Sequence, residues 1–153
     1  MRNNKKLLVE QIDRKIAPFQ EVNNVIIPNV GWISAIRNAI NMTMAQLGDK
    51  LNMTRQGVKY HEESEIKGSI TLNTLREFGE AMDLKLVYGF VPKDGTIENL
   101  IDRKAKELAT KIVMRTNQNM VLEDQGIYGD KIDNNIEELT EVLKREMRKS
   151  LWD

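Results

Sequence analysis

The stretch that decides the fold is TMAQLGDKLNMTRQGVKYHEE, residues 43–63. It predicts two short helices joined by a tight turn. Thr43 and Gln46 match the capping-box pattern that begins a helix, and Asn52 tolerates the left-handed conformation of a tight turn. Gly48, inside the first helix, leaves room for a second helix to cross closely. A helix-turn-helix requires this layout.

The second helix of the pair has a polar outer face. Thr54 can cap it, and the residues that it turns outward are Arg55, Gln56, Lys59 and Tyr60. Arg and Lys can donate hydrogen bonds to guanine O6 and N7, and Gln can pair with adenine N6 and N7. We therefore expect these four exposed residues to contact DNA bases.

Hydroxyl and cationic side chains lie near the starts of the predicted helices, where backbone N–H groups suit phosphate oxygens. The expected contacts to the DNA backbone are Thr43, Thr54, Lys67, Ser69, Thr71 and Thr74. The alternative is an ordinary helical hairpin with a solvated outer face. The two helix caps, the small residue and the polar outer side chains together favour DNA.

The rest of the chain predicts helices around this pair and a single strand. Apolar residues recur at helical spacing in residues 4–16, 31–42, 71–82, 97–117 and 134–151. In residues 84–91 the period changes to two, which is typical of a strand. The expected fold is mainly α: a helix-turn-helix core, one short β-strand and a helical C-terminal extension.

Three segments follow from this pattern. They are an N-terminal helix and linker (1–30), the helix-turn-helix domain with its trailing strand (31–92) and the helical extension (93–153). We expect Trp32 and Leu72 to pack in the core, His61 to be half-buried there, and Trp152 to anchor the C-terminus. The acidic run Glu62, Glu63 and Glu65 is expected to be a solvated helix end rather than a metal site.

Composition excludes several classes of protein. The chain has 153 residues, 23 Lys and Arg against 23 Asp and Glu, one His and no Cys. No apolar run approaches the roughly 20 residues that span a bilayer, and the lack of Cys fits the cytoplasm. One His without Cys argues against a zinc site. Nothing resembles a phosphate loop or a catalytic triad, so we expect no enzyme, no cofactor and no metal.

The zero net charge conceals a basic stretch. Between Thr43 and His61 the chain carries Lys50, Arg55 and Lys59 against only Asp49. A neutral total does not exclude a small basic face on one domain.

Residues 31–82 resemble the Cro/repressor-type, or xenobiotic-response-element, helix-turn-helix domain. Over nearly its whole length the chain is similar to the family called mobile mystery protein A. The stretches that carry this resemblance are Gly31-Trp32-Ile33, Met53-Thr54-Arg55-Gln56-Gly57-Val58, Leu72-Asn73-Thr74-Leu75, Leu86-Val87-Tyr88, Val91-Pro92, Leu122-Glu123-Asp124-Gln125 and Leu151-Trp152-Asp153. The resemblance implies a DNA-binding regulator carried on mobile elements beside a Fic-domain protein, and hence an antitoxin-like role.

The sequence departs from these patterns in three places. Met44 stands where the repressor-type domain usually has a phosphate-clamping Gln, and His61 stands where an apolar residue is usual. Inhibitory helices of Fic antitoxins carry Ser or Thr four residues before Glu, and no Ser or Thr here has that spacing. Inhibition by such a helix is therefore not expected.

The sequence is compatible with two functions. The first is a sequence-specific transcriptional regulator, antitoxin-like and autoregulatory, that reads a palindromic operator as a homodimer. The alternative is an antitoxin that neutralises a Fic-domain toxin, with the loop 122–130 and the last helix as its binding surface. We expect the dimer to form by pairing of the strand 84–91 between two chains, because a lone strand leaves its backbone groups unpaired. The C-terminal helices are the alternative dimer surface.

Overall fold

The computed structural model describes residues 2–122 and 128–153. The chain divides into two compact units, residues 24–88 and residues 1–23 together with 89–153. We call them the central unit and the terminal unit. Regular structure in the described residues is helical, which confirms the prediction of a mainly α protein. The N-terminal helix, which the sequence predicts as a segment separate from the C-terminal helices, lies with them in the terminal unit.

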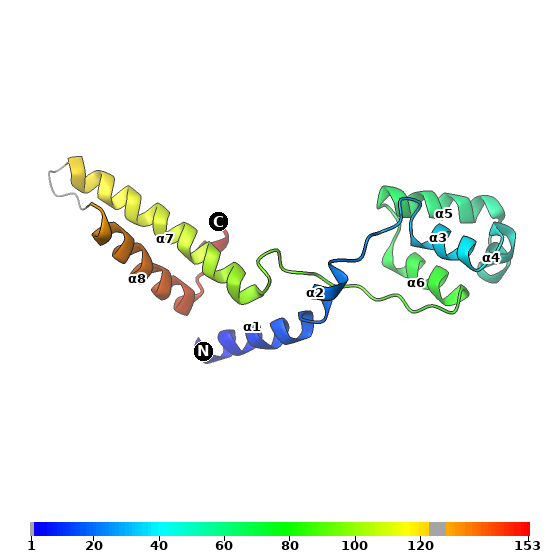
Figure 1. Cartoon of the computed structure of the whole chain (residues 1–153), viewed down its shortest axis with the longest axis horizontal. Helices are drawn as coiled ribbons and strands as arrows, with labels where there is room; N and C mark the ends of the chain where they lie inside the picture. Colours follow the sequence, from blue (N-terminus) through cyan, green and yellow to red (C-terminus); the bar gives the residue numbers. More distant parts are fainter. Residues whose placement is uncertain (1, 123–127) are drawn as a thin grey trace. The chain divides into compact units, whose positions relative to one another are not determined.

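The central unit is a cluster of four helices around one apolar core (Figure 1). Its helices are α3 (Trp32–Ala39), α4 (Met44–Leu51), α5 (Arg55–Lys67) and α6 (Leu72–Ala81). Each helix contributes to the core, whose buried apolar side chains are Ile33, Leu47, Val58, Phe78 and Met82. Both α3 and α4 pack against α5 and α6. This arrangement confirms the predicted helices at residues 31–42 and 71–82 around the helix pair α4 and α5.

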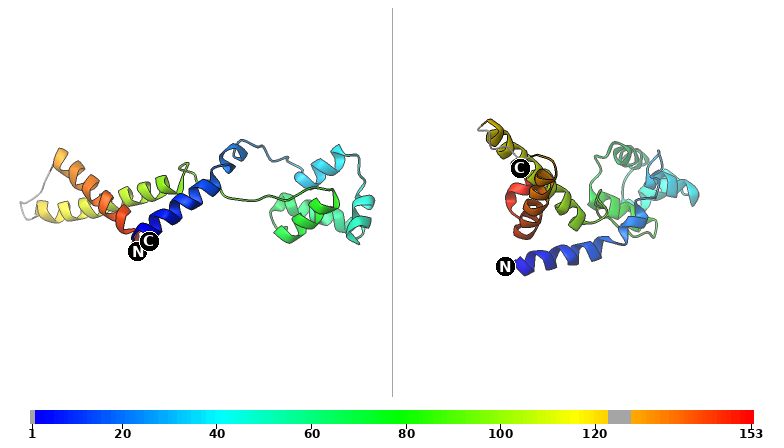
Figure 2. Two further views of the ribbon diagram at one scale, coloured as in Figure 1. Left: turned by 90° about the horizontal axis from the view of Figure 1, so that it is seen from below. Right: turned by 60° about the vertical axis from the view of Figure 1, so that its left-hand side comes forward.

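The terminal unit is built on two long antiparallel helices, α7 (Ile97–Leu122) and α8 (Asp130–Glu146), which lie side by side (Figure 2). The N-terminal α1 (Arg2–Ile16) packs against α7, and the short α2 (Phe19–Val22) follows it. Ala105 and Ala109 on α7 are fully buried, so the small side chains let a neighbouring helix approach closely. The core of this unit also includes Leu143 of α8 and Leu151.

The predicted strand is wrong. Residues 84–91 have no regular structure, and the described part of the chain contains no strand at all. Alternation of apolar side chains with their neighbours indicates a strand only where another segment can pair with the backbone of that stretch. The other β-branched segment, Val25-Ile26-Ile27, ends at Pro28, and Ile26 and Phe90 are 89 % and 86 % exposed. Pairing of residues 84–91 with a second chain stays a prediction.

Two predicted core positions, Trp32 and Leu72, and the predicted C-terminal anchor Trp152 are also wrong. Trp32 and Leu72 are 40 % and 46 % exposed, because both lie in the first turn of their helices, at the edge of the core. Trp152 is exposed, and its neighbour Leu151 is buried instead. The last helix ends at Glu146, since Met147 adopts a left-handed conformation (φ 46°), and the 3₁₀ turn η1 (Lys149–Trp152) then places Leu151 against α7.

Candidate nucleic-acid interface

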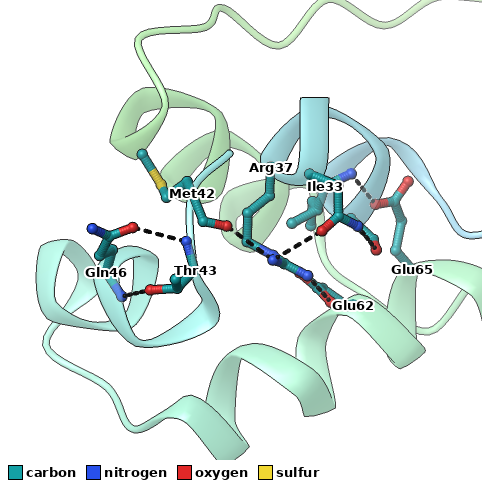
Figure 3. A network of polar contacts seen from close by, with 9 residues as sticks. Ile33, Arg37, Met42, Thr43, Gln46, Glu62 and Glu65 are labelled. Atoms are coloured by element: carbon teal, nitrogen blue, oxygen red, sulfur yellow. Dashed lines mark hydrogen bonds and ion pairs between the residues drawn. The ribbon is translucent and has the colours of Figure 1, made fainter. Parts of the chain in front are cut away.

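The junction of α4 and α5 forms as the sequence predicts. The Gln46 N–H donates to the Thr43 hydroxyl (3.1 Å) and the Thr43 N–H donates to the Gln46 side-chain oxygen (2.9 Å), which completes the capping box (Figure 3). Asn52 ends α4 in the left-handed conformation, with φ 55°. A Cβ atom on Gly48 would lie 2.6 Å from the Met53 carbonyl oxygen. The turn therefore requires glycine at position 48.

A buried ion pair holds α5 to α3. The Arg37 Nε and Nη2 atoms donate to the two carboxylate oxygens of Glu62 at 2.6 and 3.3 Å, and both side chains are 7 % exposed (Figure 3). Arg37 also donates to the Met42 carbonyl at 3.0 Å, just before α4 begins. This single side chain therefore fixes α5 relative to both α3 and the start of α4.

A second acidic side chain of α5 caps the start of α3. The Glu65 carboxylate accepts hydrogen bonds from the backbone N–H groups of Trp32 (2.6 Å) and Ile33 (2.9 Å). These N–H groups belong to the first turn of α3, where backbone N–H groups have no hydrogen-bond acceptor within their own helix. Gly31 makes room for this contact, since a Cβ atom there would lie 2.9 Å from the Glu65 Cδ atom, and its φ is 82°.

The expectation that this acidic run is a solvated helix end is therefore wrong for Glu62 and Glu65 and correct only for Glu63. A signal was present in the sequence. Glu62 lies four residues after the buried Val58 and Glu65 seven residues after it, so all three share one helix face. The partner of Glu62, Arg37, could not be identified from the sequence, because pairing across 25 residues depends on the tertiary fold.

The first two turns of α5 carry side chains that are open to solvent. Arg55, Gln56, Lys59 and Tyr60 are all exposed, as the proposed base contacts require. With Glu62 and Glu65 directed toward α3, Glu63 is the only acidic side chain that α5 leaves exposed. The outer face of α5 therefore carries a net positive charge, although the run of acidic residues in the sequence suggests the contrary.

Three of the proposed backbone contacts cap the starts of helices, as the sequence predicts, whereas Lys67 lies at the C-terminal end of α5. The hydroxyls of Thr43, Thr54 and Thr71 each accept a backbone N–H at 3.1 Å, so all three residues are helix N-caps. Lys67 ends α5 and is exposed, and Ser69 follows it in the turn, also exposed. The Thr74 hydroxyl lies 2.9 Å from that of Thr71 and is only half-exposed.

Other candidate chemistry finds little support. His61 is half-buried, with its ring 5.4 Å from that of Phe78, which confirms its place at the core. In the part of the chain that the structure describes, no three His, Cys, Asp or Glu side chains gather as a metal site would require. Among these same residues no helix has the length and apolar character that crossing a membrane requires. Residues 123–127 of the proposed partner-binding loop lie outside the described residues.

Comparison of the chain with family models, with curated proteins and with solved structures found no match. The resemblance to the repressor-type and mobile mystery protein A families therefore stays a prediction.

Proposed function

We propose that the protein is a sequence-specific DNA-binding regulator of transcription, acting in the cytoplasm, with α5 as the helix that enters the major groove. One observation carries this proposal. Arg55, Gln56, Lys59 and Tyr60 are exposed on the outer side of α5, while Glu62 and Glu65 of the same helix bind to α3. The helix thus offers hydrogen-bond donors to DNA and keeps most of its acidic groups away from the phosphates.

The spacing of these residues suits successive base pairs. Arg55 and Gln56 lie in the first turn of α5, and Lys59 and Tyr60 follow four residues later. Four residues of an α-helix rise about 6 Å, which corresponds to roughly two base-pair steps along the duplex. The two pairs of side chains can therefore reach different base pairs of one half-site.

The helix caps can position the DNA backbone. A threonine hydroxyl has one donor and two acceptor sites. Since Thr43, Thr54 and Thr71 each use an acceptor site for a backbone N–H, the hydroxyl proton of Thr43 or Thr54 is available to a phosphate oxygen. The positive ends of the helix dipoles at these caps add to the attraction.

The experiment is selection of bound sequences from a library of random duplexes with the full chain. We expect enrichment of a palindrome, since a homodimer would place two α5 helices about one helical turn, roughly 34 Å, apart. Affinity for the enriched site should exceed that for a scrambled duplex by about 10³-fold or more. It should also fall as salt rises, because phosphate contacts release counterions. Recovery of a random pool, with no sequence enriched, would contradict the proposal.

Substitutions at the proposed base contacts and at the proposed backbone contacts should affect DNA binding in different ways. We expect Thr43→Ala to weaken binding to the enriched and the scrambled duplex by the same factor, because phosphates carry no base identity. Thr43→Ser keeps both the cap and the hydroxyl and is the matched control, with affinities close to those of the parent. Loss of binding to the enriched duplex alone would show that Thr43 takes part in base recognition.

A second candidate is an antitoxin that binds a Fic-domain protein, and autoregulation of such a pair would combine both functions. The terminal unit supports it, because this unit has its own core and is not needed to present α5. Co-expression with a neighbouring Fic-domain protein, followed by purification through a tag on either chain, tests this directly. We expect a complex that survives Arg55→Ala, and its absence would leave DNA binding as the single function.

A further inference from the structure

We infer that Tyr60 recognises a pyrimidine C5-methyl group in the major groove, which in unmodified DNA is that of thymine, and that His61 positions the tyrosine ring for this contact. The inference rests on the proposed function, since it concerns the outer face of α5. It can nevertheless fail while that function holds, because a helix can read base edges through hydrogen bonds alone.

Tyr60 places an aromatic ring among the hydrogen-bonding side chains of the outer face of α5. The residue is 66 % exposed, and Arg55, Gln56 and Lys59 are exposed with it. A tyrosine side chain has a large apolar body with one polar group, the hydroxyl, at its end. The outer face therefore combines donors for base edges with an apolar surface, and the two need different partners on DNA.

The ring of Tyr60 is held by aromatic contacts that end in the core. Its centroid lies 5.2 Å from that of His61 with an interplanar angle of 75°, and the His61 ring lies 5.4 Å from that of Phe78 at 62°. Both pairs have the edge-to-face arrangement that aromatic rings favour. Phe78 is fully buried and His61 is half-buried. The core thus supports the Tyr60 ring on one side, while much of its surface stays open to a partner.

Tyr60 also lies in the part of α5 that the proposed docking places in the groove. In a helix-turn-helix the N-terminal residues of the recognition helix contact base edges, and Tyr60 is the sixth residue of α5. The other exposed apolar side chain of α5 is Ile66, in its last turn. Ile66 lies six residues further along, a rise of roughly 9 Å. The apolar surface nearest to the base contacts is therefore that of Tyr60.

The major groove offers an apolar ring one kind of apolar partner. Its base edges present hydrogen-bond donors and acceptors, and the thymine C5-methyl is the one apolar group among them. An aromatic ring placed against a donor or acceptor would remove water from it without supplying a hydrogen bond, which is unfavourable. Cytosine carries the same methyl group when it is methylated at C5. The chemistry that Tyr60 fits is therefore a pyrimidine C5-methyl group.

Gln56 favours thymine as the source of this methyl group. Gln56 precedes Tyr60 by four residues, so the two side chains lie one turn apart on the same face of α5. Glutamine can pair with adenine N6 and N7. An A·T base pair presents these adenine atoms and the thymine methyl group together at its major-groove edge. The face formed by Gln56 and Tyr60 therefore suits A·T base pairs.

The test uses the full chain and the duplex that selection enriches. Each thymine is replaced in turn, in both half-sites, by deoxyuridine, which lacks only the methyl group. At one position we expect binding to weaken by about fourfold per half-site, the factor that corresponds to burial of one methyl-sized group. Thymines elsewhere should change the affinity little.

Cytosine and 5-methylcytosine at this position distinguish the two sources of the methyl group. Methylation should strengthen binding relative to unmodified cytosine, and the thymine duplex should still bind most tightly. A duplex with 5-methylcytosine that binds more tightly than the thymine duplex would overturn the assignment to thymine.

Variants assign the methyl effect to one side chain. Tyr60→Ala should bind the thymine and deoxyuridine duplexes equally, whereas Tyr60→Phe keeps the ring and should keep the ratio of the two affinities. The matched control is Lys59→Ala, which should weaken binding to both duplexes and preserve their ratio. A ratio that Tyr60→Ala leaves unchanged would overturn the inference.

The role of His61 is tested by the same ratio. His61→Phe keeps an aromatic ring between Tyr60 and Phe78 and should preserve the ratio, whereas His61→Ala should lower it toward one with unchanged helix content by circular dichroism. An unchanged ratio in His61→Ala would overturn the positioning role.

The parent chain separates this inference from the proposed function. Equal affinity for every deoxyuridine duplex, with the enriched sequence still bound specifically, would overturn the inference and leave the proposed function standing. A Tyr60→Phe chain that then loses affinity for all duplexes by one factor would show that the hydroxyl contacts a phosphate. Failure of selection to enrich any sequence would overturn both.

Discussion

The two units place their charged side chains in opposite ways. In the central unit Arg37 and Glu62 form a pair with both side chains 7 % exposed, which fixes the helix that we propose for DNA recognition. In the terminal unit the pair Arg103 and Asp94 is at the surface, with side chains 44 % and 22 % exposed. An ion pair of arginine and a carboxylate therefore positions a helix in the central unit, whereas the exposed pair in the terminal unit contributes little to stability.

The two units also differ in how much apolar side-chain surface they expose. The outer face of α5 in the central unit is largely polar, as contact with DNA requires. The terminal unit leaves Leu8, Ile12 and Ile112 partly exposed, as contact with protein requires. The comparison agrees with our proposal that the central unit binds DNA and that the terminal unit is open to a protein partner, and each prediction below acts on one of the two units.

The largest effect is expected for the buried ion pair. Glu62→Ala leaves the Arg37 guanidinium buried without its carboxylate, so the free energy of unfolding should fall by about 3–5 kcal/mol. Replacing both residues, as in Arg37→Met with Glu62→Leu, should restore most of this loss, because no unpaired charge is left. Urea denaturation measures both variants. A loss below about 1 kcal/mol in Glu62→Ala would show that the pair is solvated, as Arg103 and Asp94 are.

The next largest loss of stability is expected for substitution of Gly48 in α4. Gly48→Ala places a Cβ atom against the Met53 carbonyl oxygen, and relief of the overlap should cost about 1–3 kcal/mol. The matched control is Gly57→Ala in α5, where the nearest atom to the new Cβ is 3.4 Å away. This control should be neutral or stabilise by up to about 1 kcal/mol, as alanine favours a helix. Thermal unfolding compares the two, and equal effects would argue against a close approach at position 48.

Sequence patterns predicted the parts of this fold that depend on near neighbours. The capping box of Thr43 and Gln46, the left-handed Asn52 and the small Gly48 are local, and each was correctly predicted. The strand over residues 84–91 was wrong because pairing depends on a second segment that the described chain does not supply. The exposed residues of α5 were predicted from helix periodicity, whereas Arg37 and the inward direction of Glu65 depend on how α3 packs on α5.

A smaller effect is expected at the cap of α5. Thr54→Ala removes the hydroxyl that accepts the Gly57 N–H, which should cost about 1 kcal/mol. Thr54→Ser retains the acceptor and should stay within a few tenths of a kcal/mol of the parent. Chemical denaturation of the three proteins side by side measures this, and a Ser variant as unstable as the Ala variant would exclude the cap as the cause.

The smallest effect is expected at the exposed pair of the terminal unit. The hydrogen bond from Arg103 lowers the pKa of Asp94 below its ordinary value. A carboxyl group with a lowered pKa stabilises the fold above about pH 4 and loses that contribution as the pH falls through the folded-state value. Asp94→Asn should therefore be slightly less stable than the parent at neutral pH, and the difference should vanish in acid. A difference that grows on acidification would contradict this sign.

The central claim, that the outer face of α5 reads base identity, is tested most directly by the ratio of affinities for the selected and a scrambled duplex at fixed salt. Arg55→Ala should weaken binding to the selected duplex by about 1–3 kcal/mol, or roughly 5- to 150-fold, and lower this ratio. The matched control is Arg115→Ala, which removes the same charge from an exposed position on α7 and should leave the ratio unchanged. Loss of both affinities by one factor in Arg55→Ala, or no loss at all, would contradict the claim.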